Sequence, residues 1–204
     1  MEPFQNTAQP DWDWWGKLWP TPGATLRRLG LSSGDRLAEV GCGNGYFALP
    51  AARITEPAQT YVVDLDDGLL DDLTHLAAQQ EIDTIVPLRG DARELSALLD
   101  TEVDVVLMAN TFHGIDSPET FVREAFDVLA PGGRFVVVNW HDRPREETTV
   151  DGAPRGPPTS LRLSPAETEA IVTESTAFSA VDHRELPPYH YGSLFEREAE
   201  TAER

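Results

Sequence analysis

The sequence has one cysteine, one lysine and no long apolar run, and each shortage excludes a class of protein. With Cys42 alone, the 204-residue chain can form neither an intrachain disulfide nor a cysteine-based zinc site, and we expect no bound metal. No apolar stretch approaches the roughly 20 residues that cross a membrane. The first residues also lack the positive and apolar regions of a signal peptide. We therefore expect a cytoplasmic protein without membrane contact.

Basic residues are scarce throughout the chain. Thirty-five Asp and Glu oppose sixteen Lys and Arg, and Lys17 is the only lysine, so the net charge is −19. Such a charge repels phosphate backbones, which makes nucleic acid an unfavourable partner. An acidic surface also suits concentrated salt, because the Debye length falls to ~3 Å near 1 M and like charges stop repelling. We expect a halophilic origin, under which the argument against nucleic acid weakens.

The segment 37–47 places three glycines at alternate positions directly after an apolar strand. Gly41, Gly43 and Gly45 let the backbone turn sharply and leave no Cβ between the chain and a ligand. A helical stretch follows, and its first N–H groups face the turn. The pattern predicts a nucleotide-type pocket at the carboxyl end of a first strand. A dinucleotide site spaces its glycines as G-x-G-x-x-G, and Tyr46 in the third position would obstruct pyrophosphate.

Four further segments follow in order. A second buried strand, 60–64, ends in Asp64, whose carboxylate can accept hydrogen bonds from both hydroxyls of a ribose. Gly90-Asp91-Ala92 follows a third strand over 84–89. A fourth strand runs into Asn110, and Pro131-Gly132-Gly133 lies between a helix and a fifth strand at 135–138.

Together, these five segments resemble the ordered motifs of the class I S-adenosylmethionine-dependent methyltransferases. The resemblance implies S-adenosyl-L-methionine as cofactor, with its methionine part and ribose on the glycine loop and its adenine amine bonded to Asp91. The cofactor-binding residues that it implies are Glu39, Gly41, Cys42, Gly43, Asn44, Gly45, Asp64, Leu65, Gly90, Asp91, Ala92 and Asn110.

The same resemblance implies a single α/β domain of the Rossmann-like, doubly wound type. Its seven-stranded sheet would have the order 3-2-1-4-5-7-6, closed by an antiparallel hairpin from strands 178–185 and 191–197. We expect a lid over residues 1–25, the methyltransferase domain over 26–197 and a frayed tail over 198–204, in a monomer or homodimer. Helices are expected over 22–31, 45–54, 68–80, 92–99, 117–129 and 165–176, with N-caps at Thr21, Ser117 and Ser164.

Two histidines follow strands four and five and are candidates for catalysis. His113 and His141 would lie on the rim of the crevice outside the strand ends, where a base of near-neutral pKa could serve methyl transfer. Packing against the cofactor is the alternative for His113. We interpret His75, His183 and His190 as surface or structural residues.

Two other clusters bear on the methyl acceptor. Arg143, Arg145 and Arg155 lie in an irregular insertion over 142–160 and suit a carboxylate or phosphate. Acidic neighbours make internal pairing the preferred interpretation; they are Asp142, Glu146, Glu147 and Asp151. The N-terminal tryptophans, with Trp15 and Trp19 on one helical face, predict either a lid over the site or an anchor onto the sheet; they are Trp12, Trp14, Trp15 and Trp19.

The function predicted from these features is in-line methyl transfer from S-adenosylmethionine to a small molecule. A non-catalytic regulator that binds the same cofactor remains an alternative. A nucleotide-dependent oxidoreductase is a further alternative that the glycine spacing disfavours.

Overall fold

The computed structural model describes residues 11–198. The first ten residues of the predicted lid and residues 199–204 of the predicted tail lie outside this range. The boundary that we placed between lid and domain stays a prediction, and helix α2 (Pro22–Arg28) runs across it.

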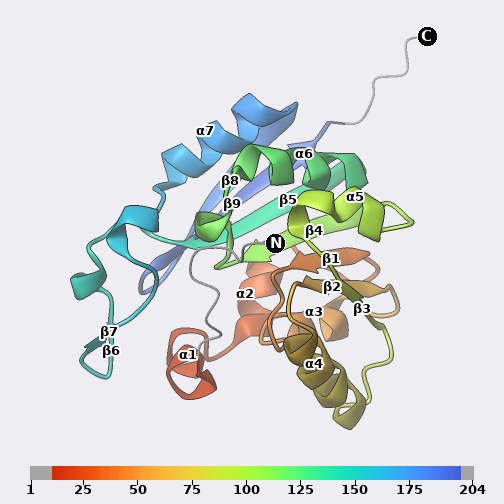
Figure 1. The fold of residues 1–204 in the computed structure, drawn as a ribbon, viewed down its shortest axis with the longest axis horizontal. Helices are drawn as coiled ribbons and strands as arrows, with labels where there is room; N and C mark the ends of the chain where they lie inside the picture. The colour runs from red at the N-terminus through yellow and green to blue at the C-terminus, as the bar shows by residue number, and fades with distance from the viewer. Residues whose placement is uncertain (1–10, 199–204) are drawn as a thin grey trace.

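A seven-stranded sheet with the order β3-β2-β1-β4-β5-β9-β8 forms the centre of the fold (Figure 1). Its first five strands pair in parallel, and β9 is antiparallel to both β5 and β8. The order confirms the prediction, because β6 (Thr149–Val150) and β7 (Ala153–Pro154) form a separate hairpin and shift the numbering. The strands of the main sheet are β1 (Leu37–Val40), β2 (Thr60–Asp64), β3 (Ile85–Arg89), β4 (Val103–Ala109), β5 (Leu129–Trp140), β8 (Phe178–Leu186) and β9 (His190–Arg197).

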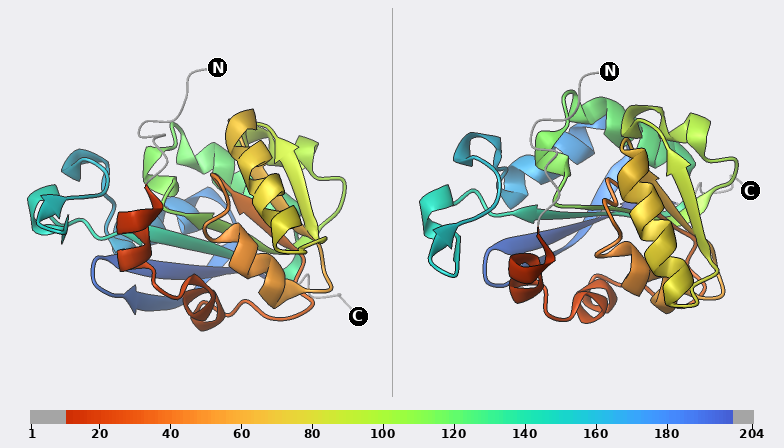
Figure 2. Two further views of the ribbon diagram at one scale, coloured as in Figure 1. Left: turned by 90° about the horizontal axis from the view of Figure 1, so that it is seen from below. Right: turned by 60° about the horizontal axis from the view of Figure 1, so that its bottom comes forward.

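Helices cover both faces of the sheet (Figure 2). One face packs against α5 (Leu95–Leu98), α6 (Pro118–Val128) and α7 (Pro165–Ser175). The other packs against α1 (Trp12–Leu18), α2, α3 (Ala48–Thr55) and α4 (Asp67–Gln79). No helix among residues 11–198 combines the length and apolar character that crossing a membrane requires.

Successive side chains along each strand point to opposite faces of the sheet, so the core has one part on each face. In β5, Phe135 and Val137 pack with α5 to α7, whereas Val136 and Val138 pack with α1 to α3. All four side chains are buried, as expected for a sheet covered on both sides.

Several predicted boundaries were wrong. The region 92–99 divides into a 3-10 turn (Ala92–Glu94) and α5, α3 begins at Ala48 instead of residue 45, and α2 ends at Arg28. Strand β5 already begins at Leu129, six residues before the predicted strand. The 142–160 insertion also contains regular structure, namely the β6–β7 hairpin and short 3-10 turns around it.

The three predicted helix caps differ in the structure. Ser164 forms a complete capping box with Glu167 at the start of α7. Ser117 has φ +62° and makes no capping hydrogen bond, and Thr21 makes none either. An N-cap residue normally has an extended backbone, and the left-handed backbone of Ser117 does not fit that role. The serine-proline pattern alone was therefore insufficient to predict a cap.

Candidate functional site

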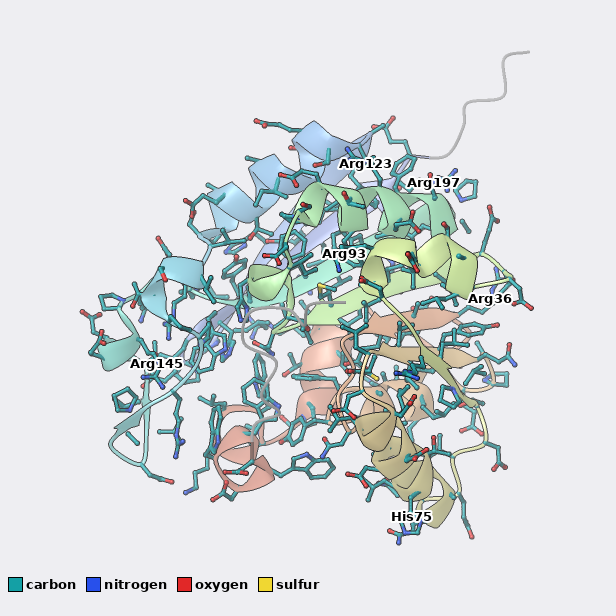
Figure 3. The ribbon with its side chains drawn as sticks, in the orientation of Figure 1. Arg36, His75, Arg93, Arg123, Arg145 and Arg197 are labelled. Atoms are coloured by element: carbon teal, nitrogen blue, oxygen red, sulfur yellow. The ribbon has the colours of Figure 1, made fainter. Side chains whose placement is uncertain are left out.

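A cavity of about 760 Å³ lies at the carboxyl ends of the parallel strands. The five strands contribute Val40, Asp64, Arg89, Ala109 and Trp140. Helix α1 and the segment after β5 complete the lining. Figure 3 labels Arg145 in that segment, at the end of the molecule away from α4. The cavity thus joins the predicted cofactor motifs to the predicted acceptor region in one space.

The glycine loop forms the turn that its spacing predicted. Gly41, Gly43 and Gly45 have φ values of +70°, +54° and +93°. A Cβ on Gly41 would lie 2.8 Å from two atoms of the Thr111 side chain, and one on Gly45 would lie 2.8 Å from Leu73. Glycine is therefore required here by both backbone conformation and space.

Asp64 holds this loop at the end of β2. Its Oδ2 accepts a hydrogen bond from the Gly43 N–H at 2.9 Å, and its Oδ1 accepts one from the Asp66 N–H at 3.1 Å. The carboxylate lines the cavity and still has lone pairs to offer.

Two buried polar side chains in the lining lack partners. The Glu39 Oε2 and both amide atoms of Asn110 make no hydrogen bond within residues 11–198. Burial, with a smaller contribution from Asp64, raises the pKa of Glu39 to about 8, so this carboxyl is neutral at pH 7. Asn110 also has φ +62°. Unpaired polar atoms and a strained backbone concentrate where ligands bind.

Asp91 departs from the expected arrangement. Its carboxylate accepts hydrogen bonds from the Arg93 Nε at 3.0 Å and from the Arg93 Nη2 at 2.6 Å. This guanidinium lowers the pKa of Asp91. Asp91 is absent from the cavity lining, although Gly90 and Ala92 on either side belong to it. The sequence contained the signal, since an arginine two residues on competes for the same carboxylate.

The predicted cofactor residues divide by their position. Those that line the cavity are Glu39, Gly41, Cys42, Gly43, Asp64, Leu65, Gly90, Ala92 and Asn110. Those outside the lining are Asn44, Gly45 and Asp91. Burial raises the pKa of the Cys42 thiol, so this side chain packs as a neutral group.

The two candidate histidines do not share the cavity. His113 lines it and lies 3.4 Å from the Asn139 Oδ1 through its Nδ1. Burial lowers the pKa of His113 to about 4, which leaves a neutral imidazole at pH 7. His141 is not in the lining; its Nε2 lies 3.0 Å from Glu185 and its ring packs 5.1 Å from Tyr191. Our expectation that both lie on one rim is therefore wrong for His141.

Aromatic side chains form one wall of the cavity. Trp14, Trp15 and Trp140 line the cavity, and the Trp15 and Trp140 ring centroids lie 6.5 Å apart. A Cβ on Gly156, which has φ +86°, would lie 2.8 Å from the Trp140 indole, so the insertion passes directly over that ring. Trp140 and Gly156 were not among the predicted site residues, although the Gly-Pro-Pro at 156–158 signals a constrained backbone.

Helix α1 is anchored on the sheet and contributes to the cavity lining, whereas its action as a lid stays a prediction. Trp15 and Trp19 are buried in one core cluster with the sheet. The Trp12 Nε1 donates to the Asn44 Oδ1 at 2.9 Å, and the Tyr46 hydroxyl donates to the Trp19 carbonyl at 2.8 Å. The helix thus fixes the glycine loop from above.

Comparison with known proteins agrees with this geometry. Residues 38–137, from β1 through most of β5, match the family described as a methyltransferase domain. These residues belong to the class I S-adenosylmethionine-dependent methyltransferase family. A methyltransferase from Aquifex aeolicus has the same fold, with a TM-score of 0.74 over 87% of this chain and 89% of that chain at 20% identity.

Curated relatives of this methyltransferase carry different activities in their names. A fatty-acid O-methyltransferase of Mycolicibacterium smegmatis is 32% identical over 124 residues, or 59% of this chain and 44% of that protein. An S-adenosyl-L-methionine-dependent Diels-Alderase of Talaromyces variabilis is 31% identical over 121 residues, or 58% and 41%. The chain spans less than half the length of these relatives.

S-adenosyl-L-methionine is the cofactor of this methyltransferase, and the cavity suits it. The unpartnered Glu39 and Asn110 atoms are available to a ligand with an amine and hydroxyls. Carboxylates gather where β2 meets α4, with Asp64, Asp66 and Asp67 in the lining. Arg89 pairs with Asp67 at 3.0 Å, so Asp64 and Asp66 are the carboxylates that favour a ligand with a sulfonium and an ammonium.

Proposed function

We propose that this methyltransferase transfers a methyl group to a small-molecule acceptor. The supporting observation is the single cavity, in which the glycine loop and Asp64 face the aromatic wall of Trp14, Trp15 and Trp140. S-adenosylmethionine would supply an activated methyl group on a sulfonium. The protein residues would then bind the cofactor, orient the acceptor and exclude water. These tasks are most of what an in-line displacement requires.

Roles of individual residues are part of this proposal. Asp64 and the Gly41–Gly43 backbone hold the ribose side, and Gly90 and Ala92 flank the adenine. Asn110 and Glu39 supply polar groups to the remainder of the cofactor. We assign Asp91 to Arg93 and not to the ligand, because its carboxylate is already bonded.

His113 would contact the acceptor as a hydrogen-bonding group. A pKa of about 4 makes this imidazole a weak base at neutral pH. His141 lies outside the lining, bonded to Glu185, so we assign it no role in deprotonating the acceptor.

The first test is calorimetric titration with S-adenosylmethionine, its demethylated product and NAD. We expect both sulfur compounds to bind and NAD not to bind. Asp64→Ala should lower the affinity at least about ten-fold, because a charge-assisted contact is lost. In Asp64→Asn, the side chain can still accept a hydrogen bond from the Gly43 N–H. This variant should keep the conformation of the glycine loop and lose only the negative charge at position 64. Asp72→Ala, an exposed change on α4, is the matched control.

The second test separates an enzyme from a binding protein. Radiolabelled methyl from S-adenosylmethionine should appear in an acceptor when the protein is incubated with a compound collection. Cofactor binding without any labelled product would favour the regulator, or a use of the cofactor like that in the name of the Talaromyces relative.

The acidic composition supports a further proposal about habitat. A net charge of −19 suits the salt-rich cytoplasm of a halophile, where a monomer or homodimer would remain dispersed.

A further inference from the structure

Three arginines surround the acceptor end of the cavity without carboxylate partners. Arg145 and Arg155 line it, and Arg162 lies buried behind Trp140 with its guanidinium carbon 5.2 Å from the ring centroid. Within residues 11–198, none of the three forms an ion pair with an acid of the insertion: Asp151 pairs with Lys17, and Glu146 acts on Arg162 only from a distance. Our preferred interpretation of internal pairing is therefore wrong for Arg145 and Arg155.

Arg162 organises the insertion through carbonyl groups. Its guanidinium donates to the carbonyl oxygens of Pro157 at 3.2 Å, Arg143 at 3.0 Å and Arg155 at 3.1 Å. It also donates to the Thr148 hydroxyl at 2.8 Å. Carbonyl groups satisfy these donors but leave the positive charge in place. The pKa of Arg162 is lowered by burial and, to a smaller extent, by the charge of Arg145, and the charge of Glu146 opposes this shift.

The two arginines of the lining are held in position. The Arg145 Nε donates to the Gly156 carbonyl at 3.0 Å, and its backbone N–H donates to the Thr159 hydroxyl at 2.9 Å. The Arg155 guanidinium carbon lies 4.9 Å from the Trp14 ring centroid. Its buried Nε has no hydrogen-bond partner in the described part of the chain. A buried guanidinium donor without an acceptor is costly unless a ligand supplies one.

We propose that the acceptor is an organic anion with a flat or apolar body, held by Arg145 and Arg155 against the Trp14, Trp15 and Trp140 wall. This inference rests on the proposed function. The cavity differs in charge between its two ends. At the β2–α4 end, Asp64 and Asp66 remain after Arg89 pairs with Asp67 and suit a cationic cofactor, whereas the guanidiniums at the other end suit an anion. Asp11 also lines the cavity, on the lid side. Carboxylate and phosphate share the chemistry that these forks recognise.

The experiment is calorimetric titration of protein saturated with S-adenosylhomocysteine. The probes are 2-naphthoate, 2-naphthyl phosphate and 2-naphthamide, which share one aromatic body and differ in charge. We expect at least one anion to bind about ten-fold or more tightly than the amide, and the stronger of the two anions identifies the group preferred. Arg145→Met and Arg155→Met should each abolish most of this preference, and Arg155→Lys should retain part of it.

Arg143→Met is the matched control, because Arg143 is exposed in the same insertion and outside the lining. It should leave the preference unchanged. Equal binding of amide and anions, a preference that survives both methionine variants, or no binding of any probe to cofactor-loaded protein would each overturn the proposal. Failure of S-adenosylhomocysteine itself to bind would instead contradict the proposed function. Unchanged product affinity and melting temperature in the variants show that the fold is intact.

Discussion

Glu39 shows how one buried carboxyl can link the cavity to the stability of the fold. It is 2% exposed, and its pKa rises from 4.5 to about 8 through burial and the nearby Asp64. The unfolded chain releases this proton near pH 4.5, whereas the folded chain keeps it until about pH 8. The folded state therefore binds more protons across this window, and stability falls as the pH rises.

Glu39→Gln should remove this dependence. The neutral isostere should stabilise the ligand-free protein by on the order of 3 kcal/mol at pH 7, because each unit of pKa shift is worth about 1.4 kcal/mol. Urea unfolding near pH 5 and near pH 8 should show a gain that widens with pH. The exposed Glu169→Gln is the control, and a gain at Glu39 that does not change with pH would contradict the assignment.

At the same scale, Trp140 and His141 show what sequence reasoning could and could not provide. Adjacent residues at the end of a strand point to opposite faces, so only one of the pair could line the cavity. The preference for histidine as a base led us to His141, whereas the even-numbered Val136 and Val138 place Trp140 on the cavity side. Strand alternation was a better guide here than residue chemistry.

At the scale of elements, α6 and α7 begin with the same sequence pattern and different structures. Both have serine followed by proline, but only Ser164 accepts from an N–H of its helix, at 3.2 Å from the Glu167 nitrogen. Ser164→Ala should cost about 1 kcal/mol, the usual loss for a helix cap.

Substitution of Ser117 by glycine should raise the stability of the protein, in contrast to the loss expected for Ser164→Ala. The φ of +62° at Ser117 is more favourable for glycine, so Ser117→Gly should stabilise the protein by about 0.5–1 kcal/mol. Ser117→Ala should have little effect on capping. Denaturant unfolding measures all three variants, and a loss in Ser117→Ala equal to that in Ser164→Ala would indicate a cap at Ser117.

The insertion after β5 was the element least accessible to prediction. Its shape depends on Arg162, which lies outside the 142–160 segment and donates to three carbonyls within it. No local periodicity reports such a contact, because the partners are irregular backbone groups brought together by the fold. The glycine loop was predictable because its neighbouring strands and its φ requirements are local.

At the scale of the whole molecule, the resemblance carried by the five motifs implied the sheet order that the structure has, and the habitat stays a prediction. The strands alone, which are short, apolar and nearly continuous, predict a covered sheet without fixing its order. A net charge of −19 adds self-repulsion to the folded state.

Salt should therefore stabilise the fold. The melting temperature should rise between about 0.1 M and about 2 M KCl, as the Debye length falls from ~10 Å to ~3 Å or less. Over the same range of salt, exposed ion pairs such as Lys17–Asp151 would lose their small contribution to the stability of the fold. A flat or falling melting temperature would contradict a halophilic origin.

The position of β9 has a consequence for synthesis on the ribosome. This strand inserts between β5 and β8, and its first residue, His190, packs 4.1 Å from Trp140. Strands β2 to β5 can each pair with a strand that is already synthesised, because β2 adds to β1, β3 to β2, β4 to β1 and β5 to β4. Trp140 in the aromatic wall can pack against His190 only when residues 190–197 have left the exit tunnel. A nascent chain that ends before residue 190 contains the glycine loop of the cofactor site, but it lacks the strand that supports the aromatic wall.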